Sequence, residues 1–295
     1  MTVRPNPRSR GWFRHMPQPL ISSIQATVLG VVEGITEFLP ISSTGHLILV
    51  TEWMGLDNTH PGVNAFQIVI QAGALAAVFG IYLPRIRSML RGLFGRDTDG
   101  LELLKQLFVG FLPAAILGLA FADWIKQQLF APFPVILALA AGGVLMIAVE
   151  RRRLVLHGNR AAAATSGRHL TQMTLRAALL IGLAQCLAMW PGTSRSMVTM
   201  VAALVLGFTP RAAAEFSFLL ALPTLGGATV HDLVFEGPAI LEASGWFGLV
   251  LGFTVSCAVA WLAVKGLLYY LTNHGMEIFG WYRLALALIA AGALT

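Results

Sequence analysis

A polar segment from Glu33 to His46 interrupts a strongly apolar part of the chain. It reads Glu-Gly-Ile-Thr-Glu-Phe-Leu-Pro-Ile-Ser-Ser-Thr-Gly-His, with apolar residues on both sides. Two carboxylates, a run of three hydroxyls and an imidazole are costly in such surroundings unless they are paired, hydrated or bound to a metal. The segment therefore predicts a functional site, and the rest of the chain is expected to hold it in place.

Glu33 and Glu37 are four residues apart, so one helical face carries both carboxylates. Two like charges this close repel each other, and a bare pair would take up a proton. A divalent cation or a nearby arginine would keep both ionised. The simpler alternative is a pair of carboxylates at a helix end that reach headgroup water. We favour a functional pair because the hydroxyls follow directly after the break.

Ser42, Ser43 and Thr44 precede a helix that we expect to start at about Gly45. These residue types are favoured N-caps, and a helix N-terminus with free N–H groups also binds anions. His46 would lie in the first turn of that helix. A lone histidine on an apolar face is usually a packing residue, but its polar neighbours favour a role in the site.

A second polar segment reads Pro-Gly-Thr-Ser-Arg-Ser from Pro191 to Ser196. An arginine binds phosphate through a planar fork. Arg195, beside the hydroxyls of Ser194 and Ser196 at another expected helix start, forms a candidate phosphate clamp. The alternative is an arginine that only neutralises the two glutamates, and both roles can coexist.

The composition is that of a membrane protein. The chain has 295 residues, of which 56% are hydrophobic and 12% charged, whereas soluble proteins carry about 25% charged residues. Several apolar runs approach the ~20 residues that span a bilayer. The net charge of +6 lies mainly in loops and in the N-terminal tail, which favours membrane orientation over nucleic-acid binding.

The pattern predicts an all-α integral membrane fold made of two inverted repeats. Each repeat is a re-entrant helix hairpin followed by three transmembrane helices, because neither broken segment spans a bilayer without interruption. An odd number of spans forces the second repeat to enter inverted, and both breaks then meet near the midplane. This gives six spans and ten helices. The spans are expected at roughly 65–84, 107–123, 133–149, 212–233, 246–270 and 281–295.

The predicted domain organisation is a single membrane domain over 20–295, after a flexible basic tail over 1–19. The first repeat covers about 20–150 and the second about 174–295. Pro40–Ser43 align with Pro191–Ser194 at an offset of 151.

Basic residues gather in two predicted loops, 85–106 and 150–176, which lie on the same side in the six-span arrangement. The positive-inside rule makes that side cytoplasmic. The first hairpin then opens outward and the second inward. The basic tail falls on the outer side, which conflicts with the rule. On the third expected helix, Gln71 shares a face with two other polar residues and could line the cavity.

The two polar segments resemble the motifs of the bacitracin-resistance family of undecaprenyl pyrophosphate phosphatases. The family's first motif, Glu-Gly-x-Thr-Glu-Phe-Leu-Pro-x-Ser-Ser-Thr-Gly-His, is matched throughout by Glu33 to His46. The second, Pro-Gly-x-Ser-Arg-Ser, is matched by Pro191 to Ser196, although Met197 stands where the family commonly has Gly or Ala. The resemblance covers roughly residues 20–295.

The resemblance implies an integral-membrane enzyme, an undecaprenyl-diphosphate phosphatase. It would hydrolyse undecaprenyl diphosphate to undecaprenyl phosphate and inorganic phosphate at the outer face of a bacterial cytoplasmic (inner) membrane. That reaction recycles the lipid carrier for cell-wall synthesis and confers bacitracin resistance. The family depends on a divalent cation, commonly Mg²⁺ or Ca²⁺. The implied partners are a polyprenyl diphosphate and the bilayer, with a homodimer left open.

Carried over by position, Glu33 and Glu37 would bind a metal or act as a base, and Arg195 would hold the diphosphate. The nucleophile stays open between Ser43, activated by Glu37 or His46, a metal-activated water, and His46 itself. The expected catalytic residues are Glu33, Glu37, Ser43, His46 and Arg195, and the expected substrate-binding residues are Ser42, Thr44, Gln71, Ser194, Arg195 and Ser196.

Two other functions remain open at the level of sequence. A lipid-phosphate or anion translocase is the first, since inverted repeats with broken helices are common in transporters. An intramembrane Ser/His protease is the second, but paired glutamates and an arginine clamp suit phosphate better than a peptide carbonyl.

Overall fold

The computed structural model of the chain describes residues 20–129 and 132–294, with side chains left out at 122–132, 231–243 and 293–294. This part is built of helices, which confirms the predicted all-α class. The predicted tail over 1–19 lies outside the described residues. The helices are α1 (Ser23–Thr36), α2 (Ser43–Trp53), α3 (Pro61–Ile81), α4 (Leu83–Leu93), α5 (Thr98–Leu129), α6 (Pro132–His157), α7 (Arg160–Thr165), η2 (Leu170–Gln172), α8 (Leu175–Gln185), η3 (Cys186–Met189), α9 (Arg195–Val205), α10 (Pro210–Tyr270) and α11 (Glu277–Leu294).

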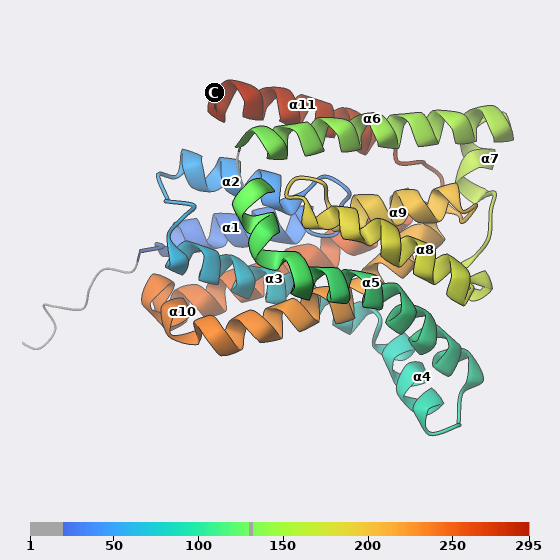
Figure 1. The fold of residues 1–295 in the computed structure, drawn as a ribbon, viewed down its shortest axis with the longest axis horizontal. Coiled ribbons are helices and arrows are strands. Elements are labelled where there is room, and N and C mark those ends of the chain that lie inside the picture. Colours follow the sequence, from blue (N-terminus) through green and yellow to red (C-terminus); the bar gives the residue numbers. More distant parts are fainter. Residues whose placement is uncertain (1–19, 130–131, 295) are drawn as a thin grey trace, which may run out of the picture.

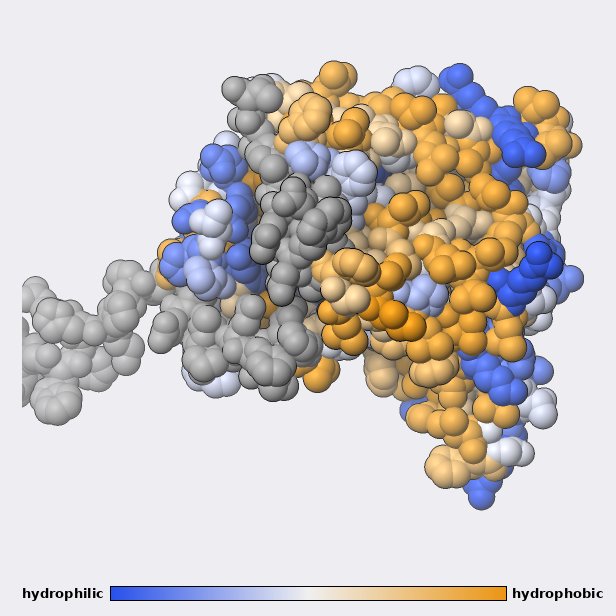
Figure 2. Space-filling view, in the orientation of Figure 1, coloured by the Kyte–Doolittle hydropathy of each residue, from blue (hydrophilic) through white to orange (hydrophobic). Residues whose placement is uncertain are grey.

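Five helical segments of the described chain are long and apolar enough to cross a membrane. Figure 2 shows an apolar surface across the middle of the molecule and polar residues toward the right and left ends. A multi-pass membrane protein follows from these two observations. Five of the six predicted spans are matched; the sixth, at 281–295, corresponds to α11, which is not among the five. The five segments are Pro61–Ile81, Thr98–Phe121, Phe133–His157, Pro210–Val230 and Ser244–Tyr270.

The last two of these segments are the arms of one element, α10. The backbone leaves the helical region inside it at Gly245, where φ is 61° and ψ is 170°. Figure 1 shows that the chain reverses direction there. Glycine adopts this conformation without steric cost, which makes a sharp reversal possible.

Two broken hairpins approach each other from opposite ends of the fold. Figure 1 shows α1 and α2 near the left end and α8 and α9 reaching in from the right. The breaks touch, because the Oγ of Ser196 donates a hydrogen bond to the carbonyl oxygen of Leu39 at 2.9 Å. The predicted meeting of the two breaks is therefore observed.

Each hairpin turns at a serine with unusual backbone geometry. Ser42 and Ser194 have φ of 73° and 72° and are the two non-glycine residues with positive φ in the described chain. Each is the N-cap of its outgoing helix, and its Oγ accepts a hydrogen bond from the backbone N–H three residues later. Such a conformation costs on the order of 1–3 kcal/mol and is typical of functional sites.

The two caps occupy corresponding places in their hairpins. Ser42 directly precedes α2 and Ser194 directly precedes α9, so the two caps lie 152 positions apart (194 − 42). Arg195 is the first residue of α9 and Ser43 the first residue of α2. The predicted alignment, which pairs the prolines at an offset of 151, instead sets Ser43 beside Ser194.

The predicted count of ten helices was wrong. The segment 85–106, expected to be a loop, contains α4 and the start of α5, and α7 lies within the expected loop 150–176. The close packing of α4 on α5 explains the first difference, because a Cβ at Gly100 would lie only 2.1 Å from the carbonyl oxygen of Ser88. Packing of this kind leaves little trace in local hydrophobic periodicity.

Small residues hold the first hairpin and α3 against the second arm of α10. A Cβ at Gly34 would lie 2.7 Å from the carbonyl oxygen of Ser256, and one at Gly73 would lie 2.4 Å from that of Phe253. The Oγ of Ser256 donates to the carbonyl oxygen of Ile70 at 2.6 Å. These close approaches place the break after α1 at a defined depth in the fold.

Candidate active site

Three side chains from the two breaks are linked through one carboxylate. The Oγ of Ser43 donates to Oε2 of Glu37 at 2.6 Å, and Nη2 of Arg195 lies 3.2 Å from Oε1 of the same carboxylate. The side chains of Arg195 and Glu37 are 9% and 6% exposed. Residues 158 positions apart in the sequence thus form a buried ion pair, as the sequence predicted.

Arg195 has a second fixed contact and one nitrogen without a partner. Its Nη1 donates to the carbonyl oxygen of Ser217 at 2.9 Å, and its guanidinium carbon lies 5.6 Å from the ring centroid of Phe38. Its Nε is buried and has no hydrogen-bond partner among the described residues. A buried guanidinium with a free donor is suited to an incoming anion, because an unsatisfied buried N–H is costly.

Glu33 is 1% exposed, and its Oε2 is buried without a hydrogen-bond partner. It lies one turn before Glu37 on α1 and within electrostatic reach of that carboxylate. Two carboxyl groups in one apolar setting demand a proton or a cation between them. Glu33 is therefore a carboxyl group with unmet bonding capacity among the described residues of the site.

His46 faces the other side of the first hairpin and is oriented by two contacts. Its Nδ1 lies 2.7 Å from the carbonyl oxygen of Ser42, and its Nε2 lies 2.7 Å from the hydroxyl of Tyr282. A carbonyl only accepts, so Nδ1 carries the hydrogen and, in the neutral ring, Nε2 accepts from the tyrosine. Ser43 hydrogen-bonds to Glu37 and has no such contact with His46 in the described chain.

The remaining predicted site residues differ in their burial and in their contacts. Ser194 and Ser196 lie at the start of α9 with their Oγ atoms 3.0 Å apart. Ser42 is buried and caps α2, whereas Thr44 is exposed at the start of that helix. Gln71 is half-buried on α3, and within the described residues it forms no hydrogen bond to either break.

Two residues of α11 that lie at the site, Tyr282 and Arg283, were not among the site residues predicted from the sequence. Tyr282 stacks on His46 with ring centroids 5.6 Å apart and an interplanar angle of 5°. Arg283 is fully buried and donates to the carbonyl oxygens of Ala138 and Gly192 at 3.0 and 2.9 Å. The one available hint was an arginine within an otherwise apolar C-terminal segment. Arg283 ties the second break to α6.

The donor set suits a hard divalent cation only in part. Magnesium and calcium prefer oxygen ligands and often use one or two carboxylates together with substrate phosphates. Glu33 offers a free carboxylate oxygen, but both oxygens of Glu37 already have partners. No group of three or more His, Cys, Asp or Glu side chains that could hold a metal occurs among the described residues. Further ligands would have to come from the bound phosphates.

Two helix N-termini meet inside the apolar helical body. They bring together buried groups of opposite charge and a hydroxyl beside a carboxylate. Helix N-termini attract anions, and the arginine fork matches a phosphate. The fold and the site define a class: a multi-pass membrane protein with an anion site between two broken helix hairpins.

Comparison with known proteins identifies the family. The family model for bacitracin resistance protein BacA matches residues 26–289, so the chain belongs to that family. It is 49% identical over 264 residues to an undecaprenyl-diphosphatase of Sorangium cellulosum, with 88% of this chain and 83% of the relative covered. It is 44% identical over 271 residues to undecaprenyl-diphosphatase 2 of Rhodospirillum rubrum, with 92% and 94% covered. An undecaprenyl-diphosphatase of Pseudomonas aeruginosa is 41% identical over 268 residues, with 91% and 92% covered.

Proposed function

We propose that this protein is a membrane phosphatase that hydrolyses undecaprenyl diphosphate to undecaprenyl phosphate and inorganic phosphate. The relatives bear the name of this activity. The observation that carries the proposal is the linkage of Ser43, Glu37 and Arg195 across the two breaks. The reaction recycles the lipid carrier of cell-wall synthesis, and resistance to bacitracin follows from a larger supply of the monophosphate.

In the proposed mechanism Arg195 binds oxygens of the diphosphate through its free Nε–H and its fork. The positive charge compensates the negative charge that develops on the transferred phosphoryl group. Ser194 and Ser196 add hydroxyl donors at the start of α9, and Thr44, exposed at the start of α2, is proposed to add another.

Ser43 is the proposed nucleophile and Glu37 its base. The Oγ of Ser43 attacks the terminal phosphorus, its proton passes to Glu37, and the bond to the bridging oxygen breaks to release the polyprenyl phosphate. Glu37 gives this proton to the departing phosphate oxygen and is ionised again. It then takes a proton from water, which attacks the phosphoserine; the proton returns to the Oγ of Ser43 as the P–O bond to serine breaks and inorganic phosphate leaves. The 2.6 Å contact between Ser43 and Glu37 supports this assignment, since a nucleophile and its base lie within hydrogen-bond reach of each other.

A divalent cation, Mg²⁺ or Ca²⁺, is proposed to be held by Glu33 and by oxygens of the diphosphate. It would supply charge neutralisation at the phosphates. The unpaired Oε2 of Glu33 supports this position. Glu37 keeps its contacts with Ser43 and Arg195 until the substrate arrives.

The proposed architecture is a pair of inverted repeats with re-entrant hairpins in a bacterial inner membrane, with the site open to the outer side. The equivalent caps at Ser42 and Ser194 support the repeat, and the opposite directions of the two hairpins support the inversion (Figure 1). Because the basic residues gather at the end where α8 starts and α9 ends, the positive-inside rule places that end in the cytoplasm.

The decisive experiment measures phosphate release from pure undecaprenyl diphosphate by the purified protein in detergent. Steady release in the presence of Mg²⁺, and its loss with excess chelator, is the expected result. A translocase built on the same architecture would release no phosphate. Full activity in chelator would remove the cation from the mechanism but leave the hydrolase assignment in place.

A further inference from the structure

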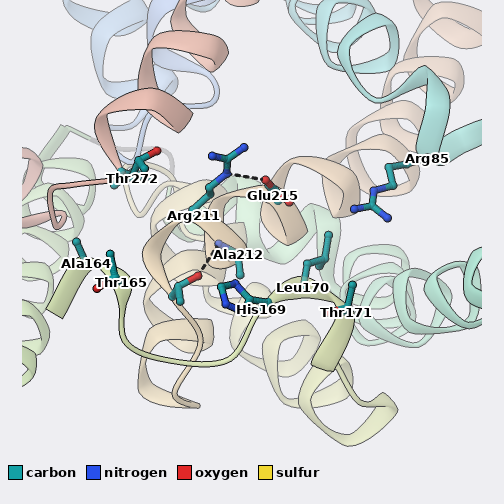
Figure 3. Close-up of a pocket in the computed structure, with 12 residues that line it drawn as sticks. Arg85, Ala164, Thr165, His169, Leu170, Thr171, Arg211, Ala212, Glu215 and Thr272 are labelled. Carbon is teal, nitrogen blue, oxygen red and sulfur yellow. Dashed lines mark hydrogen bonds and ion pairs between the residues drawn. The ribbon is translucent and has the colours of Figure 1, made fainter. Parts of the chain in front are cut away.

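A hollow of about 270 Å³ lies beside the two ends of α10, apart from the helix breaks. Figure 3 shows that its walls come from the start of α4, the segment from α7 to η2, and both ends of α10. It contains none of the residues of the two helix breaks. Its polar lining includes Arg85, His169, Thr171, Thr209, Arg211 and Glu215.

Backbone pairing holds the wall of this hollow in place. The N–H of Arg168 donates to the carbonyl oxygen of Gly207 at 2.9 Å, and the N–H of Thr209 donates to the carbonyl oxygen of Arg168 at 3.0 Å. His169 is thereby held beside the first turn of α10. Thr209 caps that helix by accepting from the N–H of Ala212 at 3.2 Å, so its own O–H remains available as a donor.

The charges around the hollow leave one cation uncompensated. Nε of Arg211 lies 3.1 Å from Oε1 of Glu215, which neutralises that carboxylate. Arg85 has no ion pair or hydrogen bond within the described chain. Figure 3 shows its guanidinium extending toward the side where Arg211 and Glu215 lie. The N-terminus of α10 adds partial positive charge.

A buried hydroxyl near the charged residues of the hollow also lacks a partner. Tyr82 joins α3 to α4 and is 7% exposed, and among the described residues its hydroxyl has no hydrogen-bond partner. Burial raises the pKa of Tyr82, the charge of Glu215 raises it further, and Arg211 and Arg85 lower it. The hydroxyl therefore lies within electrostatic reach of the three charged groups of the hollow, and it stays protonated as a donor.

The adjoining helix α4 has the character of a membrane-surface helix. It carries Arg85, Arg87 and Arg91, while Leu90 is 52% exposed and Phe94, just after the helix, is 79% exposed. Basic amphipathic helices lie at the level of lipid headgroups, and basic pockets beside transmembrane helices bind anionic headgroups. A phosphate at the hollow would lie at that level.

We propose that this hollow binds the phosphate group of an anionic membrane lipid, held by Arg85 and Arg211, the hydroxyls of Thr171 and Thr209, and the start of α10. The site is separate from the one between the breaks. Its occupation ties α4 to α10 and so stabilises the basic end of the fold.

The test follows thermal unfolding of the full-length protein in neutral detergent as phosphatidylglycerol is added, with phosphatidylcholine as the neutral lipid. We expect phosphatidylglycerol to raise Tm and phosphatidylcholine to leave it unchanged. In Arg85→Ala the phosphatidylglycerol concentration that gives half of the Tm rise should increase about tenfold, which corresponds to about 1.4 kcal/mol. Inorganic phosphate, titrated alone, is the second arm of the experiment.

Arg87→Ala is the matched control, because it removes the same charge from the same helix at an exposed residue outside the hollow. It should respond to phosphatidylglycerol like the wild type. Arg195→Lys should also keep the response, which separates this site from the one between the breaks. Equal weakening by Arg85→Ala and Arg87→Ala would reduce the effect to general basic charge and overturn the proposal. A Tm rise with inorganic phosphate and none with phosphatidylglycerol would overturn the lipid as the source of the phosphate.

Discussion

At the scale of single residues, Glu37 forms the ion pair that connects the two hairpins. Its two oxygens receive Ser43 and Arg195, which belong to different breaks. Removing one partner of such a buried ion pair destabilises the folded protein, because the remaining charge stays buried without a partner. The same residue is therefore expected to serve both the assembly of the site and the reaction.

Glu37→Gln should lower the rate of phosphate release by about 10²- to 10⁴-fold, since an amide cannot accept the proton from Ser43. Gln has the same shape and can still accept a hydrogen bond from Arg195, so the folded state should persist. The measurement is turnover together with a thermal melt in detergent. Near-normal turnover in a folded Glu37→Gln protein would exclude Glu37 as the base.

Ser43→Ala distinguishes serine attack from water attack. With serine as nucleophile, turnover should be lost almost completely, and the wild type should form a phosphoserine that rapid acid quenching can trap. If the hydroxyl only orients a water, its removal should cost about 10- to 1000-fold. Ser42→Ala is a useful comparison, because it removes a neighbouring hydroxyl that caps α2 but does not contact Glu37.

Arg195→Lys tests the planar fork. Lysine keeps the charge but presents a single ammonium, so it cannot hold Glu37 and the carbonyl oxygen of Ser217 in the same geometry. We expect a loss of about 10²- to 10³-fold in kcat/KM, with an increase in KM because the clamp also binds the ground state. Unchanged kinetics would assign Arg195 to charge balance alone.

At the scale of elements, α6 and α11 hold the second break in place through Arg283. Arg283 of α11 reaches the carbonyl oxygens of α6 and of Gly192 in the break. Gly142 of α6 makes room for it, since a Cβ there would lie 2.4 Å from Nη2 of Arg283 and 2.8 Å from Cε of Met197. The methionine that departs from the family pattern is thus accommodated by a glycine on the facing helix.

Gly142→Ala should therefore destabilise the protein by about 1–3 kcal/mol through overpacking. The double variant Gly142→Ala with Met197→Ala should recover part of that loss, because one of the two obstructing groups is gone. Gly118→Ala is the control, because a Cβ at Gly118 meets no atom within 4 Å. Thermal unfolding in detergent measures all three; equal Tm values for the wild type and Gly142→Ala would contradict the packing argument.

At the scale of the whole molecule, an apolar belt lies between two polar ends, which indicates which axis of the protein crosses the membrane (Figure 2). The basic helix α4 and the short helix α7 lie at the end opposite to α2 (Figure 1). Because cationic loops are retained in the cytoplasm, the hairpin of α1 and α2 should open to the outside. The diphosphate would then reach the site from that side.

Single cysteines in a background without Cys186 and Cys257 test this orientation. Glu52 on α2 and Arg96 between α4 and α5 are both exposed, and α2 and α4 lie near opposite ends of the fold (Figure 1). A membrane-impermeant maleimide should label Glu52→Cys in intact spheroplasts, and Arg96→Cys only after the membrane is permeabilised. The reverse pattern would place the site on the cytoplasmic side.

The sequence alone predicted the membrane class, the two breaks and a shared site of Glu33, Glu37, Ser43, His46 and Arg195, of which the structure links Glu37, Ser43 and Arg195 directly. These were readable because a polar residue in an apolar run is a local signal, and because a proline or a capping serine ends a helix locally. Only the tertiary structure determined that Tyr282 orients His46, that Arg283 supports the second break, and that Ser42 and Ser194 are the caps with positive φ. These features depend on contacts between segments up to 236 residues apart and on backbone dihedrals at the caps. The free energy of such packing depends on both contacting segments, so the sequence of either segment alone does not predict it.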